Sequence, residues 1–155
     1  MNKETQSIIR NLQNTLNGEP WYGRPVFAII TRIDPAWVYK KPNENSHSLI
    51  ELIYHMITWA EFTLKQMEKA DKEEIERIEG RDWIIIDPAI HTWKKGMMEL
   101  KNIHEKIIEL LQSKEDEWLN EKVSSRNFNY RFLLNGLIQH NIYHLGQIAY
   151  LNKML

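Results

Sequence analysis

The sequence contains no cysteine. This absence excludes a disulfide scaffold, a zinc site with thiolate ligands and a cysteine nucleophile. Any metal ion must therefore be bound by histidine and carboxylate side chains. If the protein carries out thiol or hydrolytic chemistry, its nucleophile has to come from outside the chain, as a thiol or as water.

The sequence also lacks a surplus of either charge and a long apolar run. There are 20 Lys and Arg against 21 Asp and Glu, a formal net charge of -1, so no overall field would attract nucleic acid or an anionic membrane. No stretch approaches the ~18 apolar residues needed to span a bilayer, and the first residues lack the apolar block of a signal peptide. We therefore expect a cytoplasmic protein without nucleic-acid or membrane partners.

Length and composition describe one globular domain. The 155 residues are 43% hydrophobic and 26% charged, which is the usual balance of a single domain. We expect this domain to span residues 1–155. What the chain does have is six histidines, and the question is which of them share a site.

Apolar residues recur at spacings of three and four along most of the chain, the pattern of amphipathic helices. Long helices are predicted over residues 3–16, 48–67, 87–112 and 130–153. After the first of them the sequence GEPWYGRP breaks the pattern, and a short helix over residues 26–33 continues this arm. The first helix of the fold is therefore expected to be interrupted.

Capping residues mark two of the helix starts. Ser48 followed by Glu51 matches a capping box, and Asp87 followed by proline is a cap with proline in the first turn. The charged run over residues 68–82 is expected to be a solvated helix end and connection, and DWIII at residues 82–86 an extended linker. Four long helices without a convincing alternating strand predict an all-α four-helix bundle with an interrupted first helix. An irregular orthogonal helical bundle is the alternative.

Three histidines lie on the apolar stripes of two predicted helices. In HNIYH, His140 and His144 are four residues apart, which places their Cβ atoms about 5 to 6 Å apart on one helix face. His55 lies in a comparable stripe of the helix over residues 48–67. Unpaired imidazoles there would each cost about 1 to 3 kcal/mol, so burial requires partners. We predict that His55, His140 and His144 bind one metal ion with a fourth position open. The simpler alternative for His140 and His144 is two core or helix-face histidines hydrogen-bonded to neighbours.

The donor set limits the metal and the chemistry. Three imidazoles without a thiolate suit Zn, Ni, Fe or another divalent transition ion, with Zn or Ni as the expected occupant. HNIYH is not the HExxH motif of zinc proteases, because Asn141 stands where the general base of that motif is required. Gln147, three residues after His144, is a candidate to orient a ligand or a bound water.

The other three histidines are expected to have different roles. His47 precedes the capping Ser48, and a cap or surface position is favoured over a place near the metal. His91 is expected to be exposed. His104 lies in the apolar seam of the helix over residues 87–112, where a hydrogen-bonded core histidine is favoured over a fourth ligand or a partner of a ligand.

The segments HSLIELIYHMITWAEF around His55 and HNIYHLGQIAYL around His140 and His144 resemble the DinB-like superfamily, which includes YfiT-type metal-dependent hydrolases. The early PWYGRP segment extends the resemblance over nearly the whole chain. The resemblance implies a four-helix bundle with up-down-down-up order, often a homodimer. It also places the metal-binding triad of the family on His55, His140 and His144.

The resemblance further implies an activity. Members of the superfamily include S-transferases that use a low-molecular-weight thiol such as bacillithiol or mycothiol. We therefore expect a metal-dependent transferase with such a thiol as cosubstrate and a second small molecule as substrate. A divalent ion with an open position can lower the pKa of a bound thiol. Two alternatives stay open: a YfiT-like hydrolase that activates water, and a metal-binding stress-response protein without turnover.

Overall fold

The protein is all-helical in the computed structural model, which describes residues 2–155. Apart from one isolated bridge between Lys122 and Asn129, these residues form no β-structure. The helices are α1 (Lys3–Asn17), α2 (Val26–Ile30), α3 (Leu49–Met67), α4 (Lys72–Glu79), α5 (Trp93–Gln112), the 3-10 helix η1 (Asp116–Asn120) and α6 (Tyr130–Met154). The predicted fold class is confirmed.

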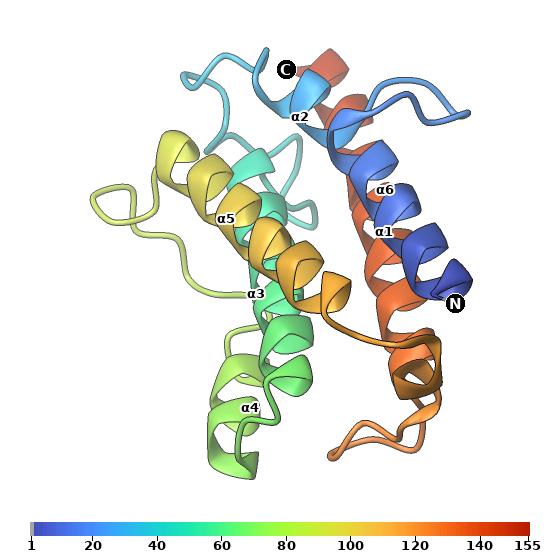
Figure 1. Ribbon diagram of the computed structural model, residues 1–155. Helices are drawn as coiled ribbons and strands as arrows, with labels where there is room; N and C mark the ends of the chain where they lie inside the picture. Colours follow the sequence, from blue (N-terminus) through green and yellow to red (C-terminus); the bar gives the residue numbers. More distant parts are fainter. Residues whose placement is uncertain (1) are drawn as a thin grey trace.

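The four long helices α1, α3, α5 and α6 form a bundle (Figure 1). In the view of Figure 1, α1 and α6 run upward while α3 and α5 run downward, which is the expected up-down-down-up order. Helix α3 packs against both α5 and α6. None of the helices between residues 2 and 155 combines the length and apolar character needed to cross a lipid bilayer.

Helix α3 is the central helix of the bundle, since 15 of its 19 residues are buried. Its start is fixed by the predicted capping box. The Ser48 hydroxyl accepts a hydrogen bond from the backbone N–H of Glu51 at 3.3 Å, and the Glu51 carboxylate accepts one from the backbone N–H of Ser48 at 2.7 Å. This reciprocal pair satisfies backbone donors that the first helical turn leaves free. By fixing the first turn of α3, the cap also fixes the face of the helix on which His55 lies.

Helices α3 and α5 approach each other closely at Gly96. A Cβ atom added to Gly96 would lie 3.1 Å from Cγ2 of Ile53 and 3.2 Å from Cε2 of Tyr54. The hydrogen of glycine therefore permits the contact, and a larger side chain would push the helices apart. Helix α5 thereby supports one side of α3.

The first arm is interrupted as predicted, but its second piece is shorter. Helix α2 ends at Ile30 rather than at residue 33. Beyond it, the backbone N–H groups of Arg32 and Ile33 donate to carbonyls three residues earlier, so the chain tightens into turns before Asp34. The start of α1 is capped by a distant residue: the Asp116 carboxylate of η1 accepts hydrogen bonds from the backbone N–H groups of Glu4 and Thr5.

The predicted start of the third long helix at Asp87 is wrong. The Asp87 carboxylate accepts a hydrogen bond from the backbone N–H of Ala89 at 2.9 Å and closes a local turn. The helix begins at Trp93, where the Thr92 hydroxyl accepts from the backbone N–H of Lys95. Both Asp87 and Thr92 have the side chains of good caps, and only Thr92 is followed by helical backbone.

The charged run, predicted as a solvated helix end and connection, contains a helix of its own. Helix α4 is capped by Asp71, whose carboxylate accepts from the backbone N–H of Glu74 at 2.9 Å. Its two apolar residues, Ile75 and Ile78, are buried against α3. Because the helix presents only these two apolar positions, its periodicity is weak in a run dominated by charge.

Candidate metal centre

His55, His140 and His144 converge in the structure. His55 comes from the middle of α3, and the other two lie one turn apart on α6. One ring nitrogen from each lies within 4.8 Å of those from the other two. The Nε2 atoms of His55 and His140 are 3.0 Å apart. His55 and His144 are buried and His140 is partly exposed, so the nitrogens are held in the interior next to an accessible edge.

The donor set fits a divalent transition-metal ion. Two nitrogen ligands on a tetrahedral zinc ion are about 3.3 Å apart, given bonds of about 2.0 Å. The separation of 3.0 Å between the Nε2 atoms of His55 and His140 is close to this distance between two ligand nitrogens. Burial lowers the pKa of His55 and His144 below the ordinary value and lowers the pKa of His140 to about 3. The rings are therefore neutral near pH 7, which is the form that binds metal.

Two of the three rings are oriented by hydrogen bonds from their second nitrogen. Nδ1 of His55 lies 3.0 Å from a carboxylate oxygen of Asp82 and 3.1 Å from its backbone carbonyl oxygen. Nδ1 of His144 lies 2.6 Å from the side-chain oxygen of Gln147. With Nδ1 donating in each case, Nε2 keeps its lone pair for an ion. The expectation that Gln147 orients a ligand agrees with this contact.

The ring of His140 is held differently. Its Nδ1 is buried and has no hydrogen-bond partner among residues 2–155. The ring packs edge to face with Trp59, with the ring centroids 6.4 Å apart. The Trp59 indole N–H in turn donates to the Asp82 carboxylate at 2.6 Å. Trp59 and Asp82 thus connect the surroundings of His140 with those of His55.

The linker after α4 covers one side of the triad. The Trp83 ring stacks on His55, with centroids 3.9 Å apart and planes within 7°. His47 stacks on Trp83 in turn, at 3.7 Å and 5°. Both Trp83 and His47 are exposed. His47 therefore lies one ring away from the triad, although a cap or surface position away from the metal is the favoured prediction for this residue.

His104 and His91 lie outside the triad. His104 is buried and uses both nitrogens: Nδ1 donates to the carbonyl oxygen of Leu100 at 2.8 Å, and Nε2 accepts from the Asn141 amide at 2.9 Å. Burial lowers its pKa to about 4. It is the predicted core histidine. His91 is half-buried rather than exposed, because its ring packs against the edge of Tyr54 and accepts a backbone hydrogen bond.

Asp82 and Trp83 are the site residues that sequence reasoning missed. They lie in DWIII, for which the sequence predicts an extended linker. The signal available there is an acidic and an aromatic residue directly before an apolar run. Their contacts with His55 join segments 27 residues apart. Spacing along one helix reveals a pair such as His140 and His144, but it carries no information on a partner from a distant linker.

Comparison with known proteins adds the family. A family model described as the DinB superfamily matches residues 24–148, a span that includes all three histidines of the triad. The comparisons with curated proteins and with solved structures find no match.

Proposed function

Since the chain belongs to the DinB superfamily, we propose that it is a metal-dependent transferase that uses a low-molecular-weight thiol. His55, His140 and His144 bind one divalent ion, with zinc or nickel as the expected occupant. The observation that carries the proposal is the convergence of three imidazole nitrogens within 4.8 Å of one another. Three ligands leave a tetrahedral ion one position for a cosubstrate.

We propose that the nucleophile is a thiol, in line with the activity that the DinB resemblance implies. An ion bound here would act as a Lewis acid, and a thiol that coordinates such an ion loses its proton without help from a base. Asp82 is the carboxylate in contact with the triad, and its Oδ1 atom accepts from both His55 and Trp59. Through this oxygen, Asp82 holds the His55 ring in place. Because the chain has no cysteine, the thiol must be a separate molecule.

The metal site is tested first, independently of activity. The metal content of the purified protein is measured by mass spectrometry, and the metal-free protein is titrated with zinc and nickel. Replacing His55, His140 or His144 singly by alanine should strip or strongly weaken binding while the helical circular dichroism is retained. His91→Ala is the matched control, since His91 contacts Tyr54 and not the triad. Equal binding by His144→Ala and the intact protein would contradict the site.

The activity is tested with a panel of thiols and a dinitrophenyl halide as model electrophile. Conjugation forms a carbon–sulfur bond, expels the halide with the bonding electron pair and releases the thiol proton to solvent. If the protein is the proposed transferase, conjugation should depend on the metal and should be abolished in His144→Ala. Turnover of esters or amides that is unaffected by thiols would favour the hydrolase instead. Metal binding without either reaction would favour a metal-binding protein without turnover.

A further inference from the structure

An apolar pocket lies next to the triad, between α3 and the first half of α6. It has a volume of about 270 Å³ and a mainly hydrophobic lining: Trp59, Phe62, Phe128, Phe132, Leu133 and Leu137. His140 also lines it. The wall that α6 contributes extends from Phe132 to His140, which is about 12 Å along the helix axis. One end of this wall is therefore a residue of the proposed metal site.

Two residues connect the apolar pocket to the triad. His140 contributes its ring to both, with Nε2 directed at His55. Trp59 lines the pocket while its indole N–H donates to Asp82, the residue that orients His55. A molecule bound in the pocket would therefore lie against the same side chains that position the ligand nitrogens.

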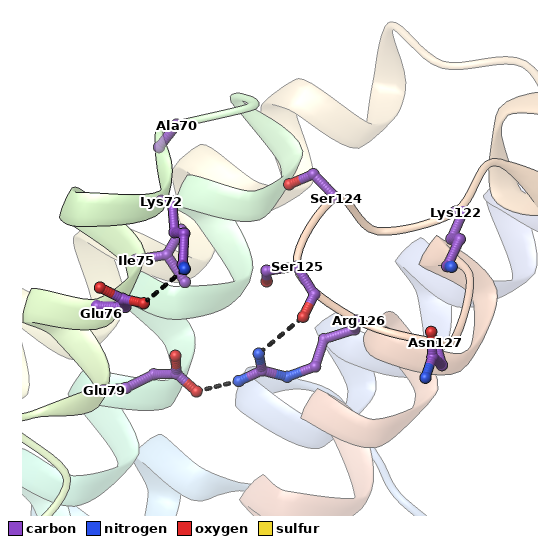
Figure 2. A pocket seen from close by; sticks show the side chains of 10 residues that line it. All are labelled: Ala70, Lys72, Ile75, Glu76, Glu79, Lys122, Ser124, Ser125, Arg126 and Asn127. Carbon is purple, nitrogen blue, oxygen red and sulfur yellow. Dashed lines mark hydrogen bonds and ion pairs between the residues drawn. The ribbon is translucent and has the colours of Figure 1, made fainter.

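Arg126 is the charged residue among those lining the apolar pocket, and its charge is already compensated. Its guanidinium forms an ion pair with Glu79 and donates to the Ser125 carbonyl oxygen at 3.0 Å, as Figure 2 shows. It also lies over the ring of Phe62, 5.1 Å from the centroid. Because its donors are directed toward Glu79 and Ser125, Arg126 offers the pocket an apolar surface rather than a free charge.

Arg126 also lines a larger cavity of about 680 Å³ between α4 and the loop before α6 (Figure 2). It is lined by several charged residues, among which Lys72 pairs with Glu76 at 3.4 Å. No residue of the triad lines it. The two cavities thus differ in chemistry, and only the smaller, apolar one adjoins the proposed metal site.

We propose that the apolar pocket is the subsite for an uncharged aromatic group on the electrophilic substrate. This proposal rests on the proposed function for the chemistry, but the binding it describes does not need turnover. A cavity of about 150 Å³ with an apolar lining holds one benzene ring, so 270 Å³ suits a group of one or two rings. Aromatic walls favour a flat ring through edge and face contacts.

Gly136 provides the means to close the apolar pocket. It lines the pocket, and a Cβ atom built on it meets no other atom within 4 Å. A leucine at this position would therefore extend into open space inside the pocket. Gly146 is the matched control, because it lies on the same helix, has equally open surroundings and does not line the pocket. Replacing glycine within a helix raises helix propensity, so both variants should fold.

The experiment measures binding of naphthylmethanol, an uncharged two-ring probe, to the metal-free full-length protein. The methyl resonances of Leu133 and Leu137 are followed by NMR during the titration. The intact protein and Gly146→Leu should show saturable shifts of these methyl groups. Gly136→Leu should lower the affinity by about tenfold or more. Naphthoate, which carries a carboxylate on the same rings, should bind more weakly to the intact protein.

Several results would overturn the proposal. These are equal affinity of Gly136→Leu and the intact protein, equal loss in both glycine variants, and tighter binding of naphthoate than of naphthylmethanol. Sedimentation of each protein tests whether a second copy of the chain fills the pocket, since Phe132 is 63% exposed. A dimer that Gly136→Leu dissociates would mean that a protein surface is the occupant. Absence of thiol conjugation would contradict the proposed function while leaving probe binding intact, so the two failures are distinguishable.

Discussion

Asp82→Ala should weaken metal binding by about tenfold, although Asp82 is not itself a proposed ligand. Its carboxylate lies 3.0 Å from Nδ1 of His55 and fixes the ring with Nε2 toward the site. Loss of such an orienting partner typically reduces metal affinity by about 10- to 100-fold. The lower end applies here because the backbone carbonyl of residue 82, 3.1 Å from the same nitrogen, remains as an acceptor. A tenfold loss corresponds to about 1.4 kcal/mol of binding free energy.

Asp82→Asn separates the charge from the hydrogen bond. Asparagine keeps an acceptor oxygen but lacks the negative charge, so its effect on metal affinity should lie between those of the intact protein and Asp82→Ala. Gln147→Ala provides a comparison at His144, where the side-chain oxygen of Gln147 at 2.6 Å is the acceptor. It should cost at least as much as Asp82→Ala, since no second acceptor for that nitrogen is found among residues 2–155.

The assay is a competition titration of zinc or nickel between a chromophoric chelator and the metal-free protein at pH 7.5. Asp87→Ala is the matched control, because Asp87 lies in the same linker and caps only a local turn. Circular dichroism and urea unfolding check that each variant is folded. Metal affinity of Asp82→Ala within a factor of about two of the intact protein would refute the orienting role. An equal loss in Asp87→Ala would show that the linker as a whole, not the Asp82 contact, is responsible.

Three further predictions concern stability and are measured by urea unfolding of the metal-free protein. Gly96→Val should lower the free energy of unfolding by about 1 to 3 kcal/mol, because the added atoms would meet side chains of α3. Gly146→Ala should instead raise the free energy of unfolding by up to about 1 kcal/mol. Equal effects of the two substitutions would contradict the close packing at Gly96. Ser48→Ala should cost about 1 kcal/mol through loss of the cap, and an unchanged midpoint would count against it. Stability should also fall as the pH drops from about 6.5 to about 4, because the pKa of His104 is about 4 in the folded protein and about 6.5 when unfolded. In this window the unfolded chain binds a proton that the folded protein does not, so His104 contributes a loss that reaches about 3 kcal/mol below pH 4 and vanishes above pH 6.5. His104→Gln should make the pH dependence shallower, and an unchanged slope would contradict the assignment.

Local signals predicted most of the secondary structure. The capping box at Ser48 and the three-and-four periodicity predicted the start of α3 to within one residue of the observed start. They failed where local chemistry was ambiguous. Asp87 and Thr92 are both suitable caps, and the choice between them depends on whether the following residues pack against α3. Helix α4 was missed because two buried isoleucines are too few to show a period within a charged run.

The sequence by itself determined that this is an all-helical protein with His140 and His144 on one face of a helix and His55 on the apolar face of another. These properties follow from interactions within a few residues of each other, which are the interactions that periodicity and caps reflect. Tertiary structure alone decided that the three imidazoles meet, that Asp82 holds His55, and that an apolar pocket adjoins His140. Such contacts depend on how helices and linkers far apart in the chain pack together, and no local pattern encodes that geometry.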